Sequence, residues 1–315
     1  LRSVNGPAVT VLDARGTNGL RCLENTNAAA NPQIAGFTLK RGNRSLSIYD
    51  MGGGLYLLNG TVSNCWILEN YTLAKGGGVY LGGGALVDCY LASNRATEWQ
   101  YGHGGAVYMT NGLVARCRFV TNWTDSHQGG GAIYMTAGTV RNCLLAGNVA
   151  NKYFDYGAVL YRGVGGAVRM TGGRLEHCTL TRNAARGPGG GLYQTGGAVT
   201  NCILAGNCVP RAVPEAYANL YQGGGSVGYS CSAPIPVGPG NTGVDPQFVD
   251  PAGDYRLRPG SPCLDSGFAL ATSADDLDRE PRPRDGDGDG AAAPDMGAYE
   301  EELPGNRPFL CNFLA

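Results

Sequence analysis

One sequence frame recurs six times between residues 52 and 207, and it constrains the fold more than any other feature. Each unit opens with Gly-Gly, has another glycine eight residues later and a cysteine thirteen residues later, and carries an asparagine five residues after that cysteine. Four columns that agree across all units fix their alignment. The units open at 52, 76, 104, 130, 165 and 189; the cysteines are Cys65, Cys89, Cys117, Cys143, Cys178 and Cys202; the asparagines are Asn70, Asn94, Asn122, Asn148, Asn183 and Asn207.

Apolar residues between these anchors follow a period of two. Alternation interrupted by glycine predicts short strands joined by tight bends. One unit has too few apolar residues to enclose a core, but stacked units place each column in line, about 4.8 Å apart, and bury it. The sequence therefore predicts an all-β parallel β-helix, a solenoid. One such column is Leu55, Val79, Val107, Ile133, Val168 and Leu192.

The asparagine and cysteine columns are expected to be structural. An asparagine amide can hydrogen-bond to the identical amide one coil above. Cysteine behaves as a small buried hydrophobe, and thiols stacked one coil apart are too parallel for unstrained disulfides. We therefore expect reduced thiols in the column. Outside it, Cys208–Cys231 or Cys263–Cys311 could pair in an exported protein, although connectivity does not follow from sequence.

Composition excludes several classes of function. Charged residues make up 16% of the 315 residues and the formal net charge is −1, so we expect no nucleic-acid partner and no attraction to anionic membranes. No apolar run approaches the roughly 20 residues of a membrane span, which predicts no transmembrane segment.

Length variation falls between each asparagine and the next Gly-Gly, so insertions are expected to emerge on one side of the solenoid. Aromatic residues gather in these insertions. Aromatics on loops over a rigid scaffold suit a carbohydrate or protein contact surface, although the same rings could simply pack back on the coils. The candidate ligand-binding residues are Trp99, Tyr101, Trp123, Tyr153, Phe154 and Tyr156.

The repeat unit Gly-Gly-Gly-Val-Tyr, followed by Gly-Gly-x-Val-x-Asn-Cys-x-Leu-x-x-Asn, resembles the repeats of bacterial polymorphic outer-membrane and autotransporter-type passenger proteins. Those proteins are right-handed parallel β-helices, so the resemblance implies a right-handed, single-stranded helix here. It covers roughly 52–207. We expect degenerate coils over 1–51 and repeats through 52–240.

A second resemblance covers about 241–302. The stretches 244–250, 255–265 and 295–300 look like the choice-of-anchor Q region that follows β-helix repeats in many bacterial surface proteins. The family has no agreed activity, but it implies an exported protein, and hence an extracellular or cell-surface location. We expect this part to be irregular and to end in an apolar tail over 303–315.

Two sets of residues are candidates for chemistry. Alternate carboxylates in Asp-Gly-Asp-Gly-Asp-Gly resemble the front half of a calcium loop, but the twelfth position is Met296 rather than glutamate, and a solvated acidic turn is the competing interpretation. The candidate calcium ligands are Asp285, Asp287, Asp289 and Asp295. Outward residues beside the cysteine column offer an acid–base set for polysaccharide cleavage, namely Asp88, Arg116 and His177, without paired carboxylates or a lyase motif.

The leading hypothesis for function is therefore an extracellular structural or adhesive solenoid without catalysis. A β-helix exposes unpaired strand edges at its ends, and the apolar tail 308–315 suits addition to a neighbour, so self-association into fibres through coil ends and tail is expected. The alternatives are a polysaccharide lyase or glycoside hydrolase, and a non-catalytic glycan-binding module that uses the insertion loops.

Overall fold

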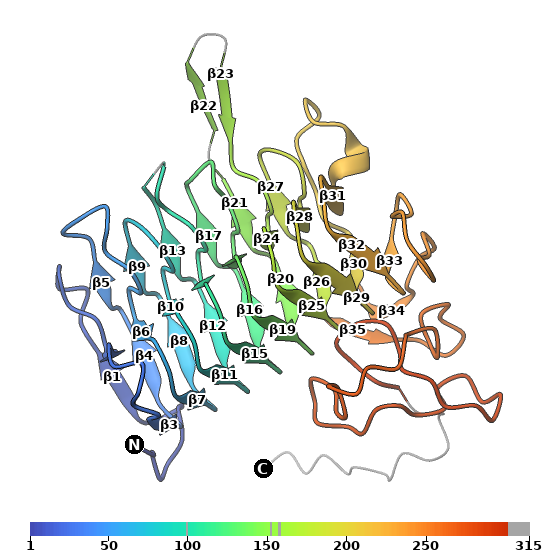
Figure 1. Ribbon diagram of the computed structural model, residues 1–315, viewed down its shortest axis with the longest axis horizontal. Helices are drawn as coiled ribbons and strands as arrows, with labels where there is room; N and C mark the ends of the chain where they lie inside the picture. Colours follow the sequence, from blue (N-terminus) through green and yellow to red (C-terminus); the bar gives the residue numbers. More distant parts are fainter. Residues whose placement is uncertain (99, 152, 157–158, 302–315) are drawn as a thin grey trace.

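The computed structural model describes residues 1–98, 100–151, 153–156 and 159–301, with no account of the side chains of 152–161. Successive coils stack along one axis, and each full coil passes through four short parallel strands. We number the four sheets in the order in which a coil visits them. The predicted all-β parallel β-helix is confirmed (Figure 1).

The first sheet follows the Gly-Gly opening of each unit. Its strands are β2 (Leu23–Asn25), β6 (Leu55–Leu57), β10 (Val79–Leu81), β14 (Val107–Met109), β18 (Ile133–Met135), β24 (Val168–Met170), β28 (Leu192–Gln194) and β31 (Leu220–Gln222). The second sheet contains β3 (Gln33–Ala35), β7 (Thr61–Ser63), β11 (Ala85–Val87), β15 (Leu113–Ala115), β19 (Thr139–Arg141), β25 (Arg174–Glu176), β29 (Ala198–Thr200) and β32 (Ser226–Gly228).

The third sheet begins directly after each cysteine of the column. It contains β1 (Val11–Asp13), β4 (Thr38–Lys40), β8 (Trp66–Leu68), β12 (Tyr90–Ala92), β16 (Arg118–Val120), β20 (Leu144–Ala146), β26 (Thr179–Thr181), β30 (Ile203–Ala205) and β33 (Cys231–Ser232). The fourth sheet, after each asparagine, contains β5 (Asn43–Arg44), β9 (Tyr71–Thr72), β13 (Arg95–Ala96), β17 (Trp123–Thr124), β21 (Val149–Ala150) and β27 (Ala184–Ala185).

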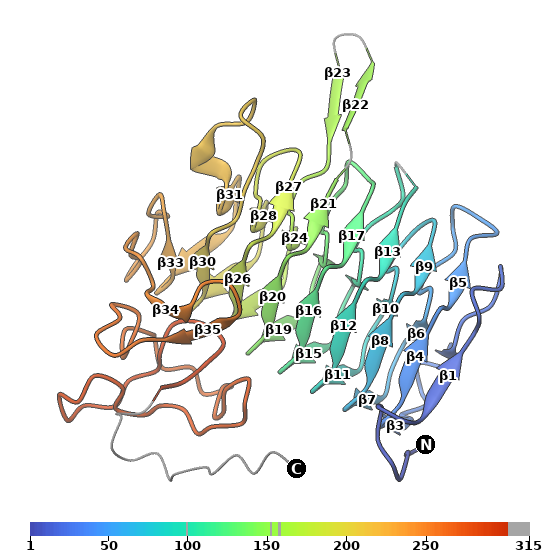
Figure 2. The same cartoon turned by 180° about the vertical axis from the view of Figure 1, so that it is seen from behind.

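The elements outside these sheets are few. An antiparallel hairpin, β22 (Tyr153–Tyr156) and β23 (Val159–Arg162), projects from the insertion side of the coils (Figure 1). A short 3₁₀ turn, η1 (Glu215–Tyr217), precedes β31. Between 241 and 301, the chain holds one antiparallel pair, β34 (Phe248–Asp250) and β35 (Asp254–Leu257), and is otherwise irregular (Figure 2).

The predicted columns pair in register. Val79 lies opposite Leu55 on one side and Val107 on the other, and all three are fully buried. The six repeat cysteines belong to the same continuous core and are free thiols. Each thiol donates to the carbonyl oxygen two residues before it, as Cys117 does to Ala115 at 3.3 Å, while the Cys89 N–H donates to the Cys117 sulfur at 3.4 Å. The expectation of reduced, structural thiols is confirmed.

The asparagine column forms a hydrogen-bonded ladder, as expected. Asn94 Nδ2 donates to Asn122 Oδ1 at 2.9 Å and to the carbonyl of Ile67 at 2.8 Å. The same Asn122 oxygen accepts the Asn94 backbone N–H at 3.0 Å. In such a buried amide, both the side-chain nitrogen and the side-chain oxygen are hydrogen-bonded. These bonds connect three consecutive coils.

A column of aromatic rings lies on the outer face of the first sheet. Tyr56 and Tyr80 stack with ring centroids 4.7 Å apart, and the stacking continues through Tyr108 to Tyr134. The next position is Arg169, whose guanidinium lies 5.2 Å from the Tyr134 ring centroid and 5.6 Å from that of Tyr193 on its other side. A planar cation thus takes the place of one ring in the column.

A second core lies outside the solenoid. Leu144, Ala146 and Ile203, on the outer face of the third sheet, pack against Phe248, Tyr255 and other apolar residues of the C-terminal region. That region therefore covers the outer face of the third sheet from β20 to β33. The outer face of β8 and β12 lies beside this covered part and lines a groove instead.

Candidate functional site

The residue before each repeat cysteine turns the chain from the second sheet to the third. We call these residues the corner column: Asn64, Asp88, Arg116, Asn142, His177 and Asn201. All six have positive φ, between 47° and 56°, a left-handed conformation that asparagine and aspartate adopt at least cost. The turn places their side chains on the outside of the coils. All three acid–base candidates belong to this column.

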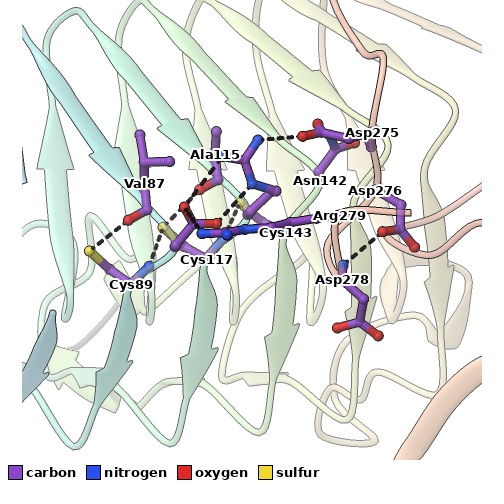
Figure 3. Close-up of polar contacts among 12 residues, drawn as sticks. Val87, Cys89, Ala115, Cys117, Asn142, Cys143, Asp275, Asp276, Asp278 and Arg279 are labelled. Carbon is purple, nitrogen blue, oxygen red and sulfur yellow. Dashed lines mark hydrogen bonds and ion pairs between the residues drawn. The ribbon is translucent and has the colours of Figure 1, made fainter. Parts of the chain in front are cut away.

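The C-terminal region runs along the corner column toward the N-terminal coils. We call residues 268–279 the seam segment. Asn201 pairs with the main chain of residue 268, Asn142 with residues 273 and 275, Arg116 with Asp275, and Asp88 with Arg279. Four of the six corner residues thus contact this one segment. Figure 3 shows Asn142 beside Asp275.

The two buried asparagines of the column hold this segment through both ends of the amide. Asn201 Nδ2 donates to the carbonyl of Phe268 at 2.7 Å, and its Oδ1 accepts the Phe268 N–H at 2.8 Å. Asn142 Nδ2 donates to the carbonyl of Asp275 at 2.6 Å, and its Oδ1 accepts from the hydroxyl of Ser273 at 3.0 Å. Both amides are fully buried, and in each the nitrogen and the oxygen are hydrogen-bonded.

His177 is sealed inside the same interface. Its ring nitrogens contact Asn201 and the guanidinium of Arg282, and its side chain is inaccessible to solvent. Arg282 in turn forms a salt bridge of 2.9 Å with Glu300, and both side chains are buried. A proton could not pass between His177 and a substrate on the surface in this arrangement.

Asp88 and Arg116 are neighbours, as the stacking of coils requires, but their charges are already paired. Asp88 accepts from Arg116 at 2.8 Å and from Arg279 at 2.9 Å. Burial opposes ionisation of Asp88, yet the hydrogen bonds from the two arginines outweigh it and hold the carboxyl pKa below its usual value. An acid held in its ionised form is a poor proton donor. The structure therefore does not bring the three candidates together at one reactive centre.

A groove of about 600 Å³ lies where the seam segment ends. Its floor is the outer face of β8 and β12, with Trp66 and Tyr90 side by side in register. Residue Trp66 is 39% exposed. Sequence reasoning missed this groove, although Trp66 stands out as the one tryptophan outside the insertions. Asn64, Trp66, Leu68, Asp88, Cys89, Tyr90, Arg116, Arg118, Leu277, Asp278 and Arg279 line it.

The aromatic candidates in the insertions do not form one described surface. Trp123 lies under the guanidinium of Arg95, 5.1 Å from it, and Tyr101 packs near Tyr49 with ring centroids 6.1 Å apart. Each of these two rings packs against a residue of another coil. Trp99 lies outside the described residues, as do the side chains of Tyr153, Phe154 and Tyr156, so their role stays a prediction.

The candidate calcium ligands separate into two environments. Carboxylate oxygens of Asp285 and Asp287 lie within 4.8 Å of one another and of Asp265, which sequence reasoning did not include. Asp265 already accepts main-chain N–H groups from Gly286, residue 287 and Ala293, which is also how a simple acidic turn is built. Asp289 is exposed and hydrogen-bonds to Ala291. Calcium binding stays a prediction for Asp285 and Asp287.

Asp295 is not part of that loop surface. It is fully buried and accepts the N–H groups of Asp265 at 2.9 Å and Glu301 at 2.7 Å. Burial, followed by repulsion from Glu300, raises its pKa to about 8. Asp295 therefore organises the interior of the C-terminal region.

The remaining cysteines do not pair as expected among the described residues. Cys208 is exposed and Cys231 is buried, and both are free thiols. Cys231 shares the second core with Cys263, while Cys311 lies outside the described residues. The Cys208–Cys231 expectation is therefore wrong for this structure.

The fold defines the class of protein, a parallel β-helix with a C-terminal region docked along one corner. No family model, curated protein or solved structure matches the chain. The resemblances to polymorphic outer-membrane repeats and to the choice-of-anchor Q region accordingly stay predictions. Within the described ranges, no helix has the length and apolar character needed to cross a membrane.

Proposed function

We propose that the protein is an extracellular structural or adhesive solenoid that does not catalyse a reaction. The observation that carries this proposal is the use of the corner column. Asp88, Arg116 and His177 hold the C-terminal region in place, and paired or buried groups of this kind are unavailable for acid–base chemistry. The extracellular location rests on the resemblance of the repeats to bacterial surface proteins.

The surface of the coils supports a structural role. No residue between 67 and 216, among those whose side chains the structure describes, is a large exposed apolar one. Beyond the last coil, by contrast, Ile235 is 62% exposed and Val237 is 87% exposed. The outer edge of β31 pairs with no further strand of the described chain. Open strand edges and exposed apolar side chains each favour association with another molecule.

A turnover screen tests the absence of catalysis. The purified protein is incubated with polyuronates and neutral polysaccharides, and unsaturated and reducing ends are measured. We expect no product above the level of a heat-denatured control. Product that disappears in Asp88→Asn but persists in Asp125→Asn, a matched aspartate paired with Arg95 on another sheet, would establish the polysaccharide-active alternative instead.

Electron microscopy and light scattering test the assembly. We expect elongated assemblies that shorten in Val237→Lys, because a charge at the end surface opposes apolar contact. Leu46→Lys is the matched control, since Leu46 is 67% exposed but lies on a loop of an early coil. A protein that stays monomeric at all concentrations would contradict the proposed assembly into filaments. It would not contradict an adhesive role.

A further inference from the structure

The groove on the outer face of β8 and β12 has a floor of two aromatic residues. Trp66 and Tyr90 are paired neighbours in adjacent coils, and both are accessible, Trp66 to 39% and Tyr90 partly. They therefore give a ligand two successive aromatic contacts along the solenoid axis. The volume of about 600 Å³ lies within the range of roughly 300–1,000 Å³ that is typical of small-molecule sites.

The charged side chains around this floor are already bound to one another. Arg116 and Arg279 contact Asp88 at 2.8 Å and 2.9 Å. Arg118 contacts Asp278 at 2.6 Å. A strongly charged ligand would have to compete with these ion pairs for its partners. The groove therefore favours a neutral occupant.

The same ion pairs can still form hydrogen bonds to a neutral ligand. A guanidinium carries more N–H donors, and a carboxylate more acceptor sites, than one ion pair uses. The side chains of Arg118 and Arg279 are 40% and 66% exposed, so a ligand in the groove can reach them. Donors and acceptors fixed side by side suit hydroxyl groups, because a hydroxyl both donates and accepts.

One amide that lines the groove is available for such a ligand. Asn64 is exposed, and its side chain forms no hydrogen bond with any described residue. Its φ of 47° is close to the 51° of Asn142 and the 56° of Asn201, and each of those two corner residues uses both its amide nitrogen and its amide oxygen. Asn64 therefore offers a donor and an acceptor beside the aromatic floor.

We propose that this groove binds a neutral glycan, with sugar rings on Trp66 and Tyr90 and hydroxyl groups on Asn64 and the arginine–aspartate pairs. A pyranose ring has C–H bonds across its faces and hydroxyl groups around its edge. An aromatic floor with polar groups beside it complements that arrangement. The inference names the ligand of the adhesive role proposed above and rests on that role. It places the ligand on the third sheet rather than on the insertion loops.

Titration of the 315-residue chain with defined oligosaccharides tests this inference. The probes are hexasaccharides of glucose, mannose, xylose and N-acetylglucosamine, with hexagalacturonate as the acidic comparison, and calorimetry measures the dissociation constant. We expect at least one neutral probe to bind. Trp66→Ala should weaken that binding at least about tenfold, because a central aromatic contact is lost. Asn64→Ala should weaken it about threefold, as expected for the loss of one hydrogen bond.

Further variants separate loss of the ring from loss of the fold. Trp66→Leu keeps an apolar side chain and should bind as weakly as Trp66→Ala, whereas Trp66→Tyr restores a ring and should recover most of the affinity. Tyr217→Ala removes a ring of matched exposure, 38%, at the turn η1, and Asn111→Ala removes an exposed asparagine. Both of these controls should bind as the parent does.

Several results would overturn the inference. They are no binding of any neutral probe, equal binding by Trp66→Ala and the parent, or binding confined to hexagalacturonate. Binding that is lost in Trp123→Ala but kept in Trp66→Ala would place the site on the insertions and would overturn it as well. These results are distinct from failure of the proposed function. Binding that depends on Trp66 and is accompanied by new reducing ends would contradict the absence of catalysis but not the glycan site.

Discussion

The side-chain amide of Asn201 binds both main-chain groups of Phe268, a residue 67 positions away in sequence. This contact begins an interface in which five of the six corner residues hold the C-terminal region against the solenoid. The repeats therefore serve two purposes. Their inward columns build the core, and their corner column provides a regularly spaced docking line.

Removal of the Asn201 amide should weaken docking of the C-terminal region. Asn201→Ala leaves the N–H and carbonyl of Phe268 without partners, which costs about 1–3 kcal/mol. Replacing asparagine in a left-handed conformation adds a backbone cost. Asn64→Ala is the matched control, because Asn64 has the same conformation but is exposed and makes no hydrogen bond with residues 268–279. We therefore expect residues 265–301 to unfold at a lower urea concentration in Asn201→Ala than in Asn64→Ala. Limited proteolysis at increasing urea concentrations measures this difference. Equal destabilisation would contradict the docking role.

Interruption of the asparagine ladder should be more costly. Asn122 accepts two hydrogen bonds from Asn94 and donates to Leu91 and Asn148. Asn122→Ala leaves several of these buried groups unpaired, so we expect a loss of at least about 3 kcal/mol in the free energy of unfolding. Asn111→Ala, at an exposed turn of the same coil, should stay within about 0.5 kcal/mol of the parent protein.

The cation in the aromatic column should be replaceable by a ring but not by a methyl group. Arg169→Ala removes its contacts with Tyr134 and Tyr193 and its hydrogen bonds to Gln128, so the thermal midpoint should fall. Arg169→Tyr restores stacking across the gap and should retain most of the stability. A tyrosine variant as unstable as the alanine variant would show that the Gln128 contacts, which both variants lack, dominate.

One histidine should make the protein less stable in acid. Burial, then repulsion from Lys75 and Arg169, lowers the His103 pKa to about 3. The unfolded chain takes up this proton near pH 6.5, so the contribution of His103 is complete above that pH and is lost as pH falls toward 3. Between pH 6 and 4 the stability of His103→Gln should fall less steeply than that of the parent, by up to about 1.4 kcal/mol per pH unit. Parallel slopes would indicate that His103 titrates normally.

The repeats could be predicted from sequence because the information is local and repeated. Glycine, cysteine and asparagine recur at constant spacing. As expected from their chemistry, the cysteines pack in the core and the asparagines form a hydrogen-bonded ladder. Even Ser230 follows the cysteine pattern, since its hydroxyl accepts the Cys202 N–H at 3.0 Å. The outward position before each cysteine was visible in the sequence too, as a column of mixed polar residues.

The use of that corner column could not be predicted. Arg116 and its partner Asp275 are 159 positions apart, and no spacing in the repeats indicates which coil meets which part of an irregular region. Asp88, Arg116 and His177 therefore looked like an acid–base set, because the chemistry of a side chain does not reveal whether another segment covers it. The groove was missed for the same reason, since its Leu277 wall comes from that region.

Hydrogen exchange at the Phe268 amide tests the docking line most directly. The account expects this amide, together with the hydrogen-bonded amides of Ser273, Asp276, Leu277, Arg279 and Arg282, to be protected in the parent protein. These amides should lose protection in the double variant Asn142→Ala/Asn201→Ala, while the amides of β26 and β30 stay protected. Rapid exchange of these hydrogen-bonded amides in the parent, or unchanged protection in the double variant, would contradict it.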